Sequence, residues 1–96
     1  MKASTLPDIE LARINMVEQQ IRPSDVSDPA VLDALIKVRR ELFVPPAYRA
    51  MAFADMEIPL EVQSTDTHQC MLSPLLEAMF TQRLQLKPDD CVLEIG

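Results

Sequence analysis

Glycine is nearly absent from this sequence. Gly96 is the only glycine among the 96 residues, and it is the last residue, whereas there are eight prolines. Turns are therefore expected to rely on the fixed φ angle of proline rather than on left-handed backbone positions. Because an intact α/β protein normally uses several glycines in its ligand-binding loops, we expect the chain to be a fragment of a longer protein.

Aromatic residues and cysteines are also scarce. Aromatic residues make up 4% of the chain, with no tryptophan, against 48% hydrophobic residues overall. One small domain with an aliphatic and methionine-rich core is therefore expected. Cys70 and Cys91 are too few for a disulfide framework, and the sequence shows neither a signal peptide nor an apolar run of ~20 residues. These absences predict a cytoplasmic protein with reduced thiols.

Positive charge is in deficit. The chain carries 9 basic and 15 acidic residues, for a net charge of −6, and its only basic cluster is the short segment 37–40. Such a balance argues against nucleic acid or an anionic membrane surface as the main partner.

What is present is dominated by helical periodicity. Residues 8–22 predict a helix that begins after an N-cap at Thr5 and stops at Pro23. Residues 29–38 predict a second helix of about three turns, capped by Asp28 and started by Pro29. The apolar stripes of the two helices comprise Leu11, Ile14, Val17 and Ile21 in the first, and Val31, Leu32, Ala34, Leu35 and Val38 in the second.

The middle of the chain is less regular. Arg39 and Arg40 are expected near the negative end of the second helix, paired with nearby acidic residues. Residues 46–52 predict a brief helix that turns Tyr48, Met51 and Phe53 inward. Residues 56–61 predict an extended edge segment, because Pro59 cannot donate to a central ladder. Residues 63–69 are polar and predict an exposed loop.

A third helix and a strand close the chain. Ser73 and Pro74 predict an N-cap and a first-turn proline, followed by a turn at 87–90. Residues 91–95, followed by Gly96, predict a buried parallel strand that leads into a tight turn. That strand needs a partner for its backbone groups, so we expect it to pair with the middle segment or with a second copy of the chain, or else to fray. The buried face of the helix is predicted to comprise Leu75, Leu76, Met79, Phe80 and Leu84.

Three segments resemble a known family in the right order. They read Met-Val-Glu-Gln-Gln-Ile-Arg at 16–22, Val-Arg-Arg-Glu-Leu-Phe-Val-Pro at 38–45, and Leu-Lys-Pro-Asp-Asp-Cys-Val-Leu-Glu-Ile-Gly at 86–96. From about Ile14 to the last residue the chain resembles the N-terminal part of the protein-L-isoaspartate O-methyltransferase family. The third segment is similar to the first half of motif I of class I S-adenosylmethionine-dependent methyltransferases.

The resemblance implies a fold class and a function. The chain would be mainly α, with a helical cap and irregular middle at 1–72. Residues 73–96 would then begin a Rossmann-like α/β methyltransferase domain with a doubly wound, seven-stranded sheet. The family transfers a methyl group from S-adenosylmethionine to isoaspartyl carboxylates of damaged proteins, so protein or peptide substrates are implied. The chain by itself is expected to be inactive and not to bind the cofactor.

The resemblance also assigns site residues. Glu94 and Gly96 are the cofactor-binding candidates. The threonine and serine of the family's catalytic loop fall on Cys70 and Leu72, so no catalytic residue is assigned, and Ser73 is interpreted as a helix cap. A methyltransferase with a different acceptor, or a stand-alone helical module that binds proteins, is the alternative function.

Two further groups have less specific interpretations. His68 and Cys70 could be ligands or a nucleophile pair, but a metal site needs three or four ligands, and an exposed histidine beside a small apolar cysteine is the simpler interpretation. We therefore predict no metal site. Met71, Met79 and Phe80 are expected to face a sheet that the chain does not contain, which would favour self-association.

Overall fold

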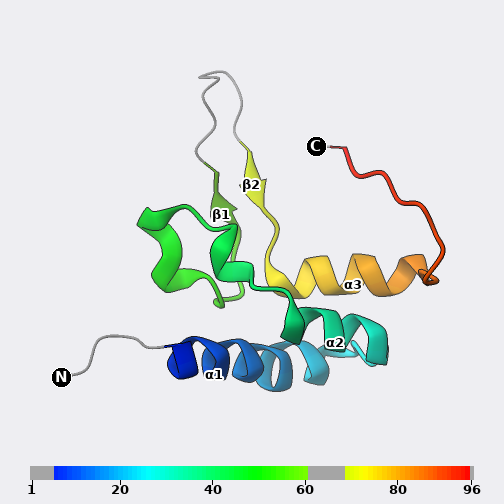
Figure 1. Cartoon of the computed structure of the whole chain (residues 1–96), viewed down its shortest axis with the longest axis horizontal. Coiled ribbons are helices and arrows are strands. Elements are labelled where there is room, and N and C mark those ends of the chain that lie inside the picture. Colours follow the sequence, from blue (N-terminus) through cyan, green and yellow to red (C-terminus); the bar gives the residue numbers. More distant parts are fainter. Residues whose placement is uncertain (1–5, 61–68, 96) are drawn as a thin grey trace.

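The computed structural model describes residues 6–60 and 69–95. In this part of the chain the fold is mainly helical, with one small antiparallel sheet in which Ile58 pairs with Met71 and Pro59 with Cys70 (Figure 1). In chain order, the elements are α1 (Leu6–Met16), η1 (Val17–Ile21), η2 (Arg22–Ser24), α2 (Pro29–Lys37), η3 (Arg40–Leu42), η4 (Pro46–Met51), β1 (Ile58–Pro59), β2 (Cys70–Met71) and α3 (Pro74–Leu84).

The first helix is longer and less regular than predicted. α1 passes into a π-helical turn, η1, and then into the 3₁₀ turn η2, which contains Pro23. The helical path therefore continues past the proline and ends at Asp25, whose φ of 69° is left-handed. The predicted N-cap Thr5 lies outside the described residues.

The predicted apolar stripe of this helix is only half right. Val17 and Ile21 are fully buried, but Leu11 is 57% and Ile14 is 42% exposed. The inward face instead carries Arg13, which is 6% exposed because its charge has a buried counterion. Hydrophobic spacing does not reveal a charged residue that is buried as half of an ion pair.

The second helix begins where the sequence predicts. The backbone N–H of Ala30 donates to Asp28 Oδ1 over 3.0 Å, which confirms Asp28 as N-cap of α2. Val31 and Leu32 are buried, but α2 ends at Lys37, and Val38 is extended and 53% exposed. The assignment of Val38 to the buried stripe is therefore wrong.

The middle of the chain largely follows the expectations. η4 is a 3₁₀ helix in which Tyr48 is half-buried, but Met51 is exposed rather than turned inward. β1 contains Pro59, as predicted for an edge segment. Of the predicted loop at 63–69, only Gln69 belongs to the described residues, and its carbonyl accepts the N–H of Leu60 over 2.9 Å.

α3 starts as predicted but buries another face. Ser73 accepts the N–H of Leu76 at 3.4 Å, and Pro74 follows at the first helical position. Pro74 and Ala78 are buried, and Leu75 and Met79 pack partly buried against the core. The prediction is wrong for the residues on the other side of the helix, which are exposed: Leu76 (36%), Phe80 (54%) and Leu84 (61%).

Residues 91–95 do not form the predicted strand. The turn before them is confirmed, since the N–H of Asp90 donates to the Lys87 carbonyl. Beyond it, Val92, Leu93 and Ile95 are 59%, 83% and 87% exposed. The sheet in the described part of the chain consists of β1 and β2, and residues 91–95 do not pair with either strand. Of the three alternatives, pairing with the middle segment is therefore wrong, the unpaired and exposed segment agrees with fraying, and pairing with a second copy of the chain stays a prediction.

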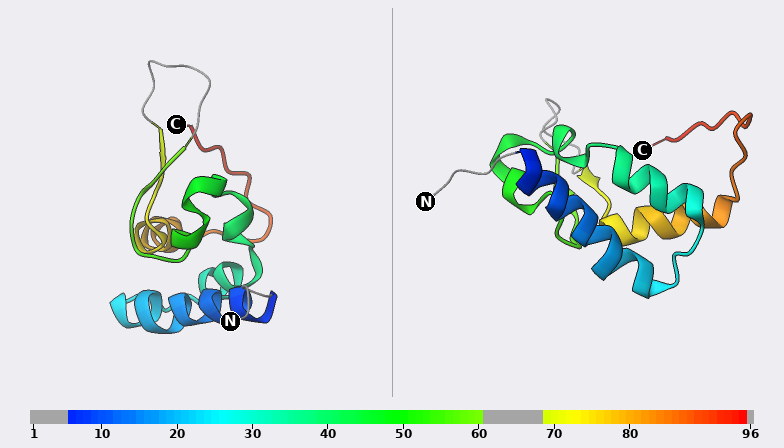
Figure 2. Two further views of the ribbon diagram at one scale, coloured as in Figure 1. Left: turned by 90° about the vertical axis from the view of Figure 1, so that its left-hand side faces the viewer. Right: turned by 60° about the horizontal axis from the view of Figure 1, so that its bottom comes forward.

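The core lies where three helices meet. α2 and α3 both pack on the helix made of α1 and η1, and the β hairpin extends away from them (Figures 1 and 2). A second, smaller core of Val44, Ala52 and Ile58 supports the hairpin. None of the helices in the described part of the chain is both long and apolar enough to cross a membrane. The main core cluster consists of Met16, Val17, Ile21, Val26, Val31, Leu32 and Ala78.

Candidate functional site

A pocket of about 340 Å³ lies where β2 leads into α3. That volume is at the lower end of the range for small-molecule sites. Its lining combines apolar side chains, one thiol and two carboxylates, from Cys70, Met71, Leu72, Glu77, Glu94 and Ile95. The pocket is therefore formed by the end of the β hairpin, the first turns of α3 and the segment 91–95.

Local hydrogen bonds fix the chain at this junction. The Ser73 cap ends the extended stretch after β2 and starts α3. Two residues further on, the N–H of Leu75 donates to Asp55 Oδ1 over 3.3 Å. The wall formed by residues 70–72 is thus attached at one end to the hairpin and at the other to the helix.

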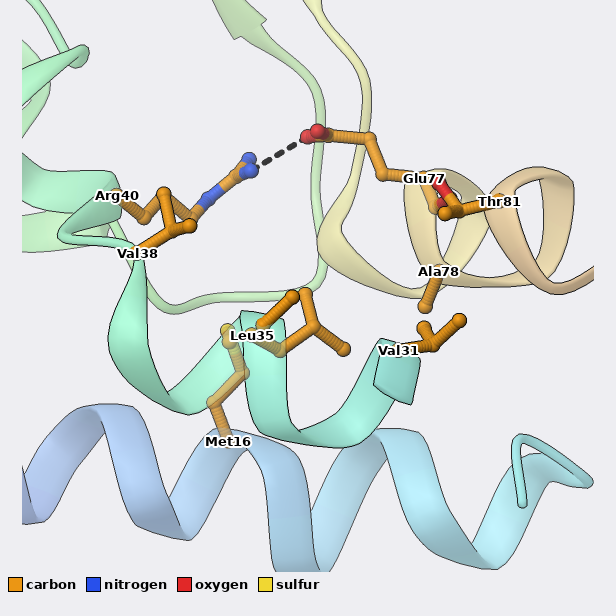
Figure 3. Close-up of a pocket in the computed structure, with 9 residues that line it drawn as sticks. Met16, Val31, Leu35, Val38, Arg40, Glu77, Ala78 and Thr81 are labelled. Atoms are coloured by element: carbon orange, nitrogen blue, oxygen red, sulfur yellow. Dashed lines mark hydrogen bonds and ion pairs between the residues drawn. The ribbon is translucent and has the colours of Figure 1, made fainter. Parts of the chain in front are cut away.

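A second pocket, of about 190 Å³, lies between α2 and α3. Figure 3 shows Met16, Leu35 and Ala78 converging on it, with the ion pair between Arg40 and Glu77 beside it. Core side chains such as Met16 and Ala78 form its floor, and exposed residues such as Val38 and Thr81 line it as well, so it is a groove at the surface between the two helices. Glu77 lines both pockets, which places the ion pair between them.

The two carboxylates of the first pocket have different surroundings. Glu77 is paired with Arg40, whereas Glu94 is exposed and has no hydrogen bond or ion pair to other described residues. A carboxylate in this state can accept hydrogen bonds from hydroxyl or ammonium groups of a ligand. The wall at Leu72 offers no hydroxyl, and the Ser73 hydroxyl is engaged as the helix cap.

The structure brings together three of the residues that the sequence singled out. Cys70, Leu72 and Glu94 line one pocket although Leu72 and Glu94 are more than twenty positions apart. Gly96 and His68 lie outside the described residues. Within residues 6–60 and 69–95, no three His, Cys, Asp or Glu side chains are grouped as metal ligands would be.

Arg40 has a role that sequence reasoning missed. It was expected to serve the end of the second helix, but it belongs to η3, and its guanidinium reaches Ala52, Leu72 and Glu77. The expected pairing of Arg39 and Arg40 with acidic residues is confirmed, with Glu41 and Glu77 as the acids. The one sign of this role in the sequence was a run of charged residues, 39–41, next to the short apolar segment 42–44.

A buried ion pair joins α1 to η3. Arg13 Nη2 donates to both carboxylate oxygens of Glu41, over 2.9 and 2.8 Å, and Arg39 Nε donates to one of them over 3.3 Å. Burial by itself would raise the pKa of Glu41. The hydrogen bonds and the charge of Arg13, a backbone hydrogen bond and the bond from Arg39 outweigh it, so the pKa lies below its ordinary value.

Comparison with known proteins adds the family. A family model described as protein-L-isoaspartate(D-aspartate) O-methyltransferase matches residues 12–96. A protein-L-isoaspartate O-methyltransferase of Methylorubrum extorquens is 38% identical over 95 residues, which are 99% of this chain and 40% of the relative. Enzymes of the same name from Herpetosiphon aurantiacus and Rhodopseudomonas palustris are 38% and 41% identical, over 88% and 84% of this chain and 35% of each relative. The chain thus spans only 35% to 40% of the length of these curated relatives.

Proposed function

Because the chain belongs to the protein-L-isoaspartate(D-aspartate) O-methyltransferase family, we propose that it forms the N-terminal part of an enzyme that methylates isoaspartyl carboxylates in proteins. The observation that supports this most directly is the match of the family model over residues 12–96. Within this range, Glu94 lines the same pocket as Cys70 and Leu72. Proteins or peptides are accordingly the proposed substrates. Nucleic acid and membranes are not proposed as partners, and the cytoplasm is the proposed compartment.

The proposed cofactor is S-adenosylmethionine, and the pocket fits part of it. The Glu94 carboxylate suits the hydroxyl or ammonium groups of such a molecule, and the apolar wall of Met71, Leu72 and Ile95 suits a flat ring. When bound, the cofactor supplies the activated methyl group. Glu94 and Gly96 would hold it, with Gly96 allowing close approach of the backbone.

The pocket wall bears on the choice of acceptor. Leu72 has an apolar side chain where a hydroxyl would be needed to bind a carboxylate, and Cys70 offers only a weak donor. A methyl acceptor other than isoaspartate is therefore the second candidate within the same reaction class. We assign no catalytic residue in this chain.

The same proposal divides the chain into two structural parts. Residues 1–72 would form a helical cap with an irregular middle, and residues 73–96 would begin the Rossmann-like α/β domain. The segment 91–95 supports this, because its exposed apolar side chains would be buried once further strands lay beside it.

Calorimetric titration with S-adenosylmethionine tests the proposal. The complete gene product is expected to bind the cofactor and to transfer its methyl group to an isoaspartyl peptide, whereas the 96-residue chain is expected to do neither. A matched aspartyl peptide is the control substrate. Failure of the complete product to bind S-adenosylmethionine would contradict the proposal, and binding with transfer to another acceptor would favour the second candidate.

A different function, a helical module that binds proteins, is favoured by one observation. Leu76, Phe80 and Leu84 follow each other at spacings of four on α3, and all three are exposed. An apolar stripe of this kind supports association, and self-association of the 96-residue chain is its simplest form.

A further inference from the structure

Arg40 connects three parts of the fold that are distant in sequence. Its Nε donates to the Ala52 carbonyl over 2.7 Å, and its Nη2 donates to the Leu72 carbonyl over 2.9 Å. Its Nη1 donates to Glu77 Oε1. The side chain is only 10% exposed, although it carries a full charge.

Each acceptor belongs to a different structural unit. Ala52 is fully buried in the small core that supports the hairpin. Leu72 closes the wall after β2, and Glu77 lies in the first turns of α3. The last two line the candidate pocket, whereas Arg40 itself does not.

The geometry of a guanidinium makes these contacts interdependent. Its N–H groups lie in one plane at fixed angles, so three acceptors that bind it are held at fixed positions relative to one another. A lysine at this position could keep the charge and one contact, but it could not reach all three acceptors. The wall is otherwise attached through a hairpin of two-residue strands, the Ser73 cap and the hydrogen bond from Leu75 to Asp55.

We propose that Arg40 is a positioning residue of the methyltransferase site, which fixes the wall at residues 70–72 and orients Glu77 in the pocket that Glu94 shares. Its effect on the ligand rests on the proposed function, whereas its effect on the wall does not. Without Arg40 the Leu72 carbonyl loses its donor, and Glu77 becomes a second unpaired carboxylate beside Glu94. Both changes disturb the pocket and leave α1 and α2 in place.

The first experiment measures order in the wall. In the 96-residue chain, ¹⁵N relaxation order parameters of residues 70–73 are expected to fall in Arg40→Gln and to fall less in Arg40→Lys, with those of α2 unchanged. The control is Arg22→Gln, which removes an exposed arginine paired with Glu18. Unchanged order at 70–73 in both Arg40 variants, or an equal fall throughout the chain, would overturn the proposal.

The second experiment measures the ligand. In the complete gene product, the Kd for S-adenosylmethionine is expected to rise about tenfold in Arg40→Gln, less in Arg40→Lys, and not at all in Arg22→Gln. An unmutated product that binds the cofactor while all three variants bind it equally well would show that Arg40 does not position the site. If the unmutated product does not bind the cofactor, the proposed function fails, and the order parameters still decide whether Arg40 fixes the wall.

Discussion

At the scale of single residues, one arginine–carboxylate pair in the described part of the chain is buried on both sides. Arg13 and Glu41 are 6% and 5% exposed, and Arg13 lies 5.9 Å from the ring centre of Phe53. Desolvating two charges is costly, so such a pair contributes more to the choice of one arrangement than to net stability. Here it fixes η3, and therefore Arg40, against α1.

Replacing Glu41 by Gln leaves Arg13 buried without a counterion. The free energy of unfolding is expected to drop by about 3 kcal/mol, since removing one member of a buried pair leaves an uncompensated charge. Urea unfolding at neutral pH measures the change. The matched control is Glu18→Gln in the exposed pair with Arg22, which is expected to cost less than ~1 kcal/mol. Equal losses of unfolding free energy in the two variants would show that breaking the buried pair costs no more than breaking the exposed one.

The same pair predicts a dependence on pH. The pKa of Glu41 is lowered in the folded chain. Its contribution to the free energy of unfolding is therefore complete above the ordinary carboxyl pKa, and it is lost as the pH falls through the pKa of the folded state. Unfolding midpoints measured between neutral and acidic pH should therefore fall more steeply below about pH 4 in the unmutated chain than in Glu41→Gln. Parallel curves would contradict this assignment.

At the scale of elements, helix ends are decided locally and helix faces are not. The Asp28 and Ser73 caps were both visible in the sequence, because a cap depends on a side chain and the backbone two or three residues ahead. The inward faces of α1 and α3 depend on which neighbour each helix meets. A long-range contact illustrates this: the Gln82 side chain accepts the N–H groups of Ser27 and Asp28 over 2.8 and 2.9 Å.

Removing the N-cap of α2 tests whether this helix end depends on local interactions. Asp28→Ala is expected to lower the free energy of unfolding by about 1 kcal/mol, because the N–H of Ala30 loses its acceptor. Asp33→Ala, on the same helix and in an exposed pair with Lys37, should change it by about 0.5 kcal/mol or less. Thermal unfolding followed by circular dichroism measures both, and a larger loss from Asp33→Ala would be incompatible with the assignment.

At the scale of the whole molecule, the chain has more apolar surface than its core can cover. The exposed side chains of α3 and of residues 91–95 include Phe80, Leu84 and Leu93. The chain spans 35% to 40% of the length of its curated relatives, and a longer chain would have further elements to bury these side chains.

This exposure predicts behaviour in solution. In sedimentation velocity, the 96-residue chain is expected to self-associate with rising concentration, and the double variant Phe80→Ser with Leu84→Ser is expected to remain monomeric. Unfolding stability should change by no more than about 0.5 kcal/mol per substitution, since both positions are on the surface. The exposed side chains Leu42 and Phe43, replaced by Ser, serve as the control patch. Association that is unaffected by the α3 variant would contradict the prediction.

Sequence alone determined what depends on neighbouring residues: the capped starts of α2 and α3, the turn at 87–90, the edge character of Pro59 and the family of the chain. Only the tertiary structure decided which residues meet across the chain. It placed Arg13 inside and Leu11 outside, left residues 91–95 without a ladder, and joined Arg40 to the wall of the pocket. The reason is physical, because burial and ion pairing depend on what lies opposite a side chain, and that is set by packing between distant segments.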